Sequence, residues 1–264
     1  MPFARCHSAG RVHYAERGES HAGSWPFLLI HGAGASSAIW MMVMARLGRA
    51  GRAVAIDLPG HGPSPAFEDK PHPTLADYCR AAGELAALTG LGRSVLIGHS
   101  MGALVAVEAA LAWPDKVAGL VLCAAAPRLP VGRDLMKVID EDYAHFPAWL
   151  AERALSASAK PALRRAFVAA GVVAPQAVTR ADFQAIAGVD LGPRLAAIRC
   201  PMLWLDGADD AIVTERGERP GVIERLAGVG HLVPVEAPAA VARAAFDMAG
   251  RLPPGCGTAV AGIL

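Results

Sequence analysis

Hydrophobic residues along the chain form short continuous runs, separated by longer amphipathic segments. Runs that predict buried strands lie at 27–30, 53–56, 94–97, 117–124, 202–205 and 222–226, and the alternating segment 11–17 predicts an edge strand. Helices are predicted at about 39–50, 75–88, 103–113 and 238–251. This alternation is typical of the α/β class, with a mostly parallel, doubly wound sheet and right-handed crossovers. Loops that follow the strands then gather at one edge, where such sheets bind ligands.

The pattern changes between residues 128 and 190, where helical segments follow one another without a strand. These segments lie at about 135–142, 148–155, 161–170 and 179–186. We therefore expect an α/β core at 1–127 and 191–251, a helical cap at 128–190, and a loop-like tail at 252–264. Four large apolar residues of the cap are interpreted as its own core rather than as substrate contacts: Phe146, Trp149, Leu150 and Phe167.

The composition of the chain indicates which kinds of partner and metal site are not expected. The 264 residues are 53% hydrophobic and carry a formal net charge of +1, so nothing favours nucleic acid or an anionic membrane surface as a partner. The five cysteines are widely spaced and form no C-x-x-C pair, which argues against disulfides and a zinc site, and Cys123 is expected to be a small core residue. No apolar run has the length of a membrane span or signal peptide, so a cytoplasmic protein is predicted. Nothing in the sequence indicates an oligomeric state.

The strongest chemical motif is Gly98-His99-Ser100-Met101-Gly102, which lies between a predicted strand and a predicted helix. Side chains at the two glycine positions would collide with neighbouring backbone in a sharp strand-to-helix turn. Such a turn presents the Ser100 hydroxyl outward and places the Met101 N–H where an oxyanion would form. Ser100 is therefore the candidate nucleophile.

A serine hydroxyl needs a base to take its proton, and the base needs an acid that fixes its tautomer. Among the nine histidines, His231 is the best base, because it follows the last predicted strand directly. Asp210 follows the strand at 202–205 on the same edge and is the candidate acid. Asp209 is its rival, and Asp206 is a more distant alternative.

Four motifs in order give the chain its resemblance to a known superfamily. They are His31-Gly32-Ala33-Gly34, Asp57-Leu58-Pro59-Gly60-His61-Gly62, the Ser100 motif, and Gly207-Ala208-Asp209-Asp210 with Gly230-His231. Together with the order serine, acid, histidine, they resemble a cap-bearing, esterase-like serine hydrolase of the α/β-hydrolase superfamily. The resemblance covers roughly residues 11–250 and implies a helical cap inserted after the sixth strand.

The resemblance also implies roles for individual residues. Ser100 would be the nucleophile, Asp210 the orienting acid and His231 the base, with the N–H groups of Ala33 and Met101 as the oxyanion hole. The function expected is cleavage of a small or medium uncharged carboxylic ester through an acyl-enzyme, with no metal or organic cofactor. Alternatives on the same fold are a C–C bond hydrolase, a lactonase, a thioesterase, a cofactor-free perhydrolase or a non-catalytic ligand receptor.

Other polar residues of these motifs have structural interpretations. His99 is expected to point away from the pocket as a packed or hydrogen-bonded histidine, while His31 fixes its loop. His61 and Ser64 are expected to shape the loop that follows Asp57, itself a strand-end residue. A dinucleotide-binding reading of residues 32–34 fails because Ser37 stands where the third glycine belongs, and it leaves the Ser100 motif unexplained.

One segment departs from the superfamily pattern. Residues 211–230 separate the acid from the base, and the predicted strand at 222–226 takes several of them. A parallel crossover needs about a dozen residues. We therefore expect the usual crossover helix to be shortened or missing.

Overall fold

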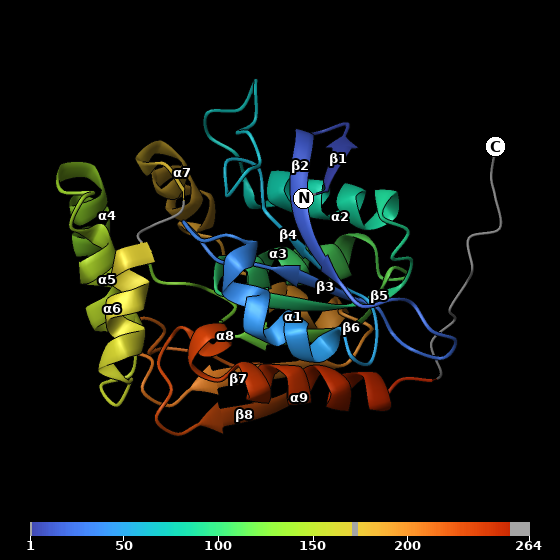
Figure 1. Cartoon of the computed structure of the whole chain (residues 1–264). Helices are drawn as coiled ribbons and strands as arrows, with labels where there is room; N and C mark the ends of the chain where they lie inside the picture. The colour runs from blue at the N-terminus through green and yellow to red at the C-terminus, as the bar shows by residue number, and fades with distance from the viewer. Residues whose placement is uncertain (1, 171–173, 254–264) are drawn as a thin grey trace.

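The computed structural model describes residues 2–170 and 174–253 (Figure 1). The strands are β1 (Phe3–Cys6), β2 (Gly10–Arg17), β3 (Phe27–Ile30), β4 (Ala53–Ile56), β5 (Ser94–His99), β6 (Val117–Cys123), β7 (Met202–Gly207) and β8 (Val222–Leu226). The α-helices are α1 (Met41–Leu47), α2 (Leu75–Leu88), α3 (Met101–Ala112), α4 (Arg133–Glu141), α5 (Phe146–Ala154), α6 (Pro161–Ala170), α7 (Gln176–Ile186), α8 (Val233–Glu236) and α9 (Pro238–Gly250). Two 3-10 helices are η1 (Ser37–Trp40) and η2 (Gly192–Ala197).

The strands form one sheet in the order β1-β2-β4-β3-β5-β6-β7-β8. β1 and β2 pair antiparallel, as do β2 and β4, and all pairings from β4 through β8 are parallel. Helices α2 and α3 pack on one face, and α1 and α9 pack on the other. Strands β3 to β6 are covered on both faces, which explains why they read as unbroken hydrophobic runs. The predicted α/β fold with a doubly wound sheet is confirmed.

Helices α4 to α7 follow β6 in the chain. No strand interrupts them in the described residues between β6 and β7. In Figure 1, α4, α5 and α6 lie beyond the tips of the β7 and β8 arrows, at the end of the sheet where the parallel strands finish. The cap predicted after the sixth strand is therefore present, while its division from the core at 128 and 190 stays a prediction. Of the tail at 252–264, residues 254–264 lie outside the described residues.

Some elements differ from the sequence expectation. β1 was not predicted, because only one of its four residues is buried and it has no hydrophobic pattern. The helix expected at 39–50 is split into η1, capped by Ser36, and the short α1. The crossover helix is missing as expected: residues 208–221 join two parallel strands without a helix. Within the described chain, no helix combines the length and apolar character needed to cross a bilayer.

Candidate active site

Ser100 occupies the turn from β5 to α3 with φ +52° and ψ −118°. Residues other than glycine rarely adopt this backbone conformation, and it is held at functional sites by tight surroundings. Those surroundings are visible at the flanking glycines. A Cβ on Gly98 would lie 2.4 Å from Gly102 O, and one on Gly102 would lie 2.2 Å from Ile30 O. The collision predicted from the sequence is therefore confirmed.

His231 and Asp210 are in contact. The Nδ1 atom of His231 lies 3.1 Å from Asp210 Oδ2, while the backbone N–H groups of Ile212 and Val213 donate to Asp210 Oδ1 at 2.9 and 3.0 Å. Burial alone would raise the pKa of Asp210, but the hydrogen bonds and charge of His231 and the two N–H donors lower it. The carboxylate is therefore ionised, and it accepts from the Nδ1–H tautomer of His231, which leaves Nε2 able to accept a proton.

The two rival carboxylates have other partners. Asp209 Oδ2 accepts a hydrogen bond from the Ser156 hydroxyl at 2.6 Å. Asp206 is fully buried and forms ion pairs with Arg216 and Arg219. The carboxylate that contacts His231 is thus that of Asp210.

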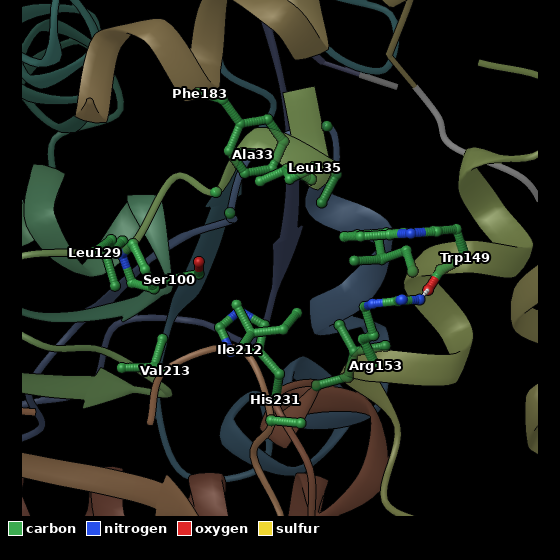
Figure 2. A pocket seen from close by; sticks show the side chains of 18 of the residues that line it. Ala33, Ser100, Leu129, Leu135, Trp149, Arg153, Phe183, Ile212, Val213 and His231 are labelled. Atoms are coloured by element: carbon green, nitrogen blue, oxygen red, sulfur yellow. Dashed lines mark hydrogen bonds between the residues drawn. The ribbon is translucent and has the colours of Figure 1, made fainter. Parts of the chain in front are cut away.

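Ser100 and His231 line one cavity of about 390 Å³, which the cap helices cover. Figure 2 shows both side chains on one side of this cavity, with Trp149 and Arg153 from α5 across it. In the described part of the chain the Ser100 hydroxyl makes no hydrogen bond, and neither does His231 Nε2. The structure therefore brings acid and base into contact and the serine into the same cavity, without a bond between serine and base. Such bonds are often loose before substrate binds.

Two backbone donors stand free beside Ser100. Ala33 lines the cavity in the loop after β3, and Met101 is the first residue of α3, where helical N–H groups have no partner within the helix. Neither N–H donates a hydrogen bond within the described residues. Both are thus available to an anion at the N-terminus of a helix, which favours negative charge.

The loop that carries Ala33 is tied to the cap by a carboxylate that sequence analysis missed. Asp182 of α7 is fully buried, and it accepts from Gly34 N–H at 2.8 Å, from Tyr78 Oη at 2.6 Å and from His61 Nε2 at 2.8 Å. Burial alone would lower the pKa of His61, but the charge and hydrogen bond of Asp182 raise it. The sequence signal that could have identified Asp182 is its helical spacing, three residues after Thr179 and four before Ile186, which are buried with it in α7.

The other polar residues of the motifs hold loops. His31 donates to Gly32 O from Nδ1 and accepts from Leu58 N–H, at 2.8 and 3.0 Å, and burial lowers its pKa, so it is neutral. Ser64 donates to Asp57 O at 2.7 Å and accepts from His13 N–H at 2.8 Å. The loop-fixing roles predicted for His31, His61, Ser64 and Asp57 are confirmed. Asp57 itself contacts His13 and accepts a hydrogen bond from Ser37 N–H. Its carboxylate is therefore already bound within the protein, which also argues against a dinucleotide-binding role.

Two interpretations were incomplete, because the residues pack as expected and also line the cavity. Phe146, Trp149, Leu150 and Phe167 all line the cavity, because the cap presents one aromatic face to the sheet edge as well as packing on itself. His99 also lines it, although it is buried and donates from Nε2 to His231 O at 2.9 Å, as a packed histidine should. Burial and the neighbouring His231 lower the pKa of His99 to about 3, so it stays neutral. Cys123 is fully buried core, as expected.

The cavity has an apolar wall with a few charged groups from the cap. Leu129, Leu135, Phe183 and Ile212 add to the aromatic residues named above. Arg133, Asp134 and Arg153 are the charged residues of the lining, besides the histidines. No group of three metal-ligating side chains occurs in the ranges that the structure describes.

Comparison with known proteins agrees with this architecture. A family model described as the alpha/beta hydrolase family matches residues 27–244. A pimeloyl-(acyl-carrier protein) methyl ester esterase of Pseudoalteromonas atlantica is 29% identical over 81% of this chain and 86% of its own length. A putative carbamate hydrolase of Variovorax paradoxus is 31% identical over 76% of this chain and 79% of its own.

Solved structures match over nearly the whole chain. An enol-lactonase from Burkholderia xenovorans superposes with a TM-score of 0.81 at 22% identity, covering 94% of this chain and 99% of its own. A thermophilic esterase from Thermogutta terrifontis gives 0.79 at 24% identity, covering 95% and 99%. At these identities the likeness establishes the fold.

Proposed function

This chain belongs to the alpha/beta hydrolase family, and from that premise we propose that it is a serine hydrolase of small or medium uncharged carboxylic esters. The observation that carries the proposal is the contact of 3.1 Å between Asp210 and His231 at the cavity that holds Ser100. An ionised acid that fixes the tautomer of a histidine, in one cavity with a serine hydroxyl, is the arrangement that activates serine as a nucleophile.

In the proposed reaction Ser100 Oγ attacks the ester carbonyl carbon while His231 Nε2 takes the hydroxyl proton. This step requires the hydroxyl to turn onto Nε2 when substrate binds. The N–H groups of Ala33 and Met101 donate to the oxyanion of the tetrahedral intermediate. The imidazolium then protonates the leaving oxygen as its bond to the acyl carbon breaks, and the acyl group stays on Ser100.

Deacylation repeats the sequence with water. His231 takes a proton from water, the resulting hydroxide attacks the acyl carbon, and Ser100 leaves with the proton returned by His231. The carboxylic acid is released and the free enzyme is restored. Each step uses only groups of the chain, the ester and water, so the proposal includes no metal or organic cofactor.

The cavity supports an uncharged substrate of modest size. Its volume is about 390 Å³, and apolar side chains dominate its wall. Apolar pockets of this size bury most of a small ligand, with few polar groups to orient it. The names of the relatives, a methyl ester esterase and a putative carbamate hydrolase, agree with hydrolysis at a carbonyl carbon.

The experiment is a substrate panel with matched variants. Purified protein is assayed on p-nitrophenyl esters of increasing acyl length and on a lactone, an acyl thioester, a vinylogous 1,5-diketone and a perhydrolysis assay. We expect ester turnover that Ser100→Ala abolishes and Ser158→Ala, whose side chain lies outside the cavity, leaves intact. Ester turnover by Ser100→Ala at the wild-type rate would refute the serine mechanism, and preference for another substrate of the panel would replace the ester assignment.

A further inference from the structure

The connection from β7 to β8, where the crossover helix is missing, carries two inward-pointing arginines. The side chains of Arg216 and Arg219 are 11% and 2% exposed, although both belong to a segment without regular structure. Buried arginine is rare unless it is paired with an acid. These two side chains meet the fully buried Asp206, at the end of β7.

Asp206 and Arg219 neutralise one another. The two terminal nitrogens of Arg219 donate to the two carboxylate oxygens of Asp206 at 3.0 and 2.7 Å, which is the bidentate geometry of a strong ion pair. Arg219 also donates to Ala125 O at 3.0 Å and lies over the Trp204 ring. Its position is therefore fixed by contacts that do not involve the active site.

Arg216 is shared between Asp206 and the acid of the candidate site. Its Nε lies 3.2 Å from Asp206 Oδ2, but without hydrogen-bond geometry. Its Nη2 donates at 3.3 Å to Asp210 Oδ2 and at 3.3 Å to Gly207 O. Asp210 Oδ2 is the same oxygen that accepts from His231 Nδ1. Because Arg219 already satisfies Asp206, the charge of Arg216 is directed at Asp210.

We propose that Arg216 is a positioning residue that holds Asp210 Oδ2 against His231 and offsets part of the carboxylate charge that the imidazole senses. The inference rests on the proposed function, since it assigns Arg216 a role in the same acid–base pair. Arg216 does not line the cavity, so it acts through Asp210 and not on substrate.

The charged groups around His231 decide the direction of the effect. Asp210 is in direct contact, His99 packs against the ring and is neutral, and Glu236 of α8 holds the N–H of Gly230. From the cap, Arg153 lines the same cavity. Arg216 Nη2 and His231 Nδ1 contact the same oxygen of Asp210, at 3.3 and 3.1 Å, so they lie at most about 6 Å apart. A positive charge there disfavours the imidazolium form of His231.

Removal of this charge should therefore favour the imidazolium form of His231. His231 must be neutral to act as a base, so the acidic limb of kcat/KM would move to higher pH, by about two units at an effective dielectric constant near 20. At a pH below both limbs, the ratio of variant to wild-type kcat/KM should be about a hundredfold lower than the same ratio at the pH optimum.

The experiment compares Arg216→Gln and Arg216→Met with Arg216→Lys, which keeps the charge, and with Arg225→Met, which removes an exposed arginine on β8. We expect the acidic limb of ester turnover to rise in the two neutral variants and to stay at the wild-type position in the other two. Arg216→Gln retains amide donors for Asp210 and Gly207, so it separates loss of charge from loss of the hydrogen bonds. A limb that is unmoved, or moved to lower pH, in both neutral variants would overturn the inference.

A second readout does not depend on turnover. The NMR titration of the His231 ring protons, identified by their loss in His231→Gln, follows the same pKa in the wild type, Arg216→Lys and Arg216→Gln. A raised midpoint in Arg216→Gln alone supports the role of Arg216 even when no ester of the panel is cleaved. An equal midpoint in all three proteins contradicts it, whatever the reaction is.

Discussion

The carboxylate of Asp182 lies 2.8 Å from Nε2 of His61, and both side chains are completely buried. Asp182 belongs to the cap helix α7, whereas His61 follows β4 in the core. The same carboxylate accepts from the N–H of Gly34, one residue beyond the proposed oxyanion donor Ala33. A single buried ion pair therefore connects the cap, the core and the loop of the proposed oxyanion hole.

Asp182→Asn should destabilise the protein by about 3–5 kcal/mol, because it leaves the charge of His61 buried without its partner. Urea denaturation at pH 6 measures the loss. Asp140→Asn is the matched control: it breaks the ion pair with Arg180 of the same helix, whose side chains are about two-fifths exposed, and should cost less than about 1 kcal/mol. Equal losses in the two variants would show that the buried ion pair of Asp182 contributes no more to stability than the exposed pair of Asp140.

His61 should make stability depend on pH. Its folded-state pKa is raised above the usual 6.5, because the charge and hydrogen bond of Asp182 outweigh the effect of burial. The contribution of protonation to stability is then complete below about pH 6.5 and is lost as pH rises through the raised folded-state pKa. The difference in unfolding free energy between wild type and His61→Gln should shrink accordingly between pH 6 and 9. A difference that grows with pH would mean that the buried histidine is neutral.

Gly102→Ala should cost more than about 3 kcal/mol or prevent folding, because its Cβ would meet backbone oxygens that cannot turn aside. The distances are 2.2 Å to Ile30 O and 2.4 Å to His31 O. Gly250→Ala is the control, since a Cβ at the end of α9 meets nothing within 4 Å. Thermal unfolding of both proteins tests the contrast, and a Gly102→Ala protein as stable as Gly250→Ala would contradict the packing of the turn.

Asp210→Asn should lower kcat by about three to four orders of magnitude, because an amide does not hold His231 in the Nδ1–H tautomer. Asp209→Asn removes a neighbouring carboxylate that contacts Ser156 instead, so its kcat should stay near the wild-type value. Steady-state ester kinetics distinguish the two. A larger loss in Asp209→Asn would reverse the assignment of the acid.

The sequence predicts the structure best where the local hydrophobic pattern and the chemistry of the motifs agree. The strand at 222–226 and the helix at 75–88 match the structure residue for residue, and Thr74 begins that helix in a capping box with Asp77. The ordered motifs also led to the contact between Asp210 and His231, because carboxyl ends of parallel strands share one edge.

The rest depends on contacts between distant segments. Asp182 and His61 are 121 positions apart, and no periodicity links them. The aromatic residues of the cap show the same limit: a large apolar side chain such as Trp149 has one hydrophobic pattern whether it packs on other cap helices or faces a cavity. The role of Arg216 likewise emerges only from the path of a connection without regular structure.

The central claim is that Ser100 is an activated nucleophile, and covalent labelling tests it most directly. The folded protein is incubated with a fluorophosphonate ester, and the adduct is located by peptide mass spectrometry. We expect one adduct per chain, on Ser100, absent from Ser100→Ala and formed at least about a thousandfold more slowly by His231→Gln. An unlabelled wild-type protein, or an adduct on another residue that persists in Ser100→Ala, would contradict the claim.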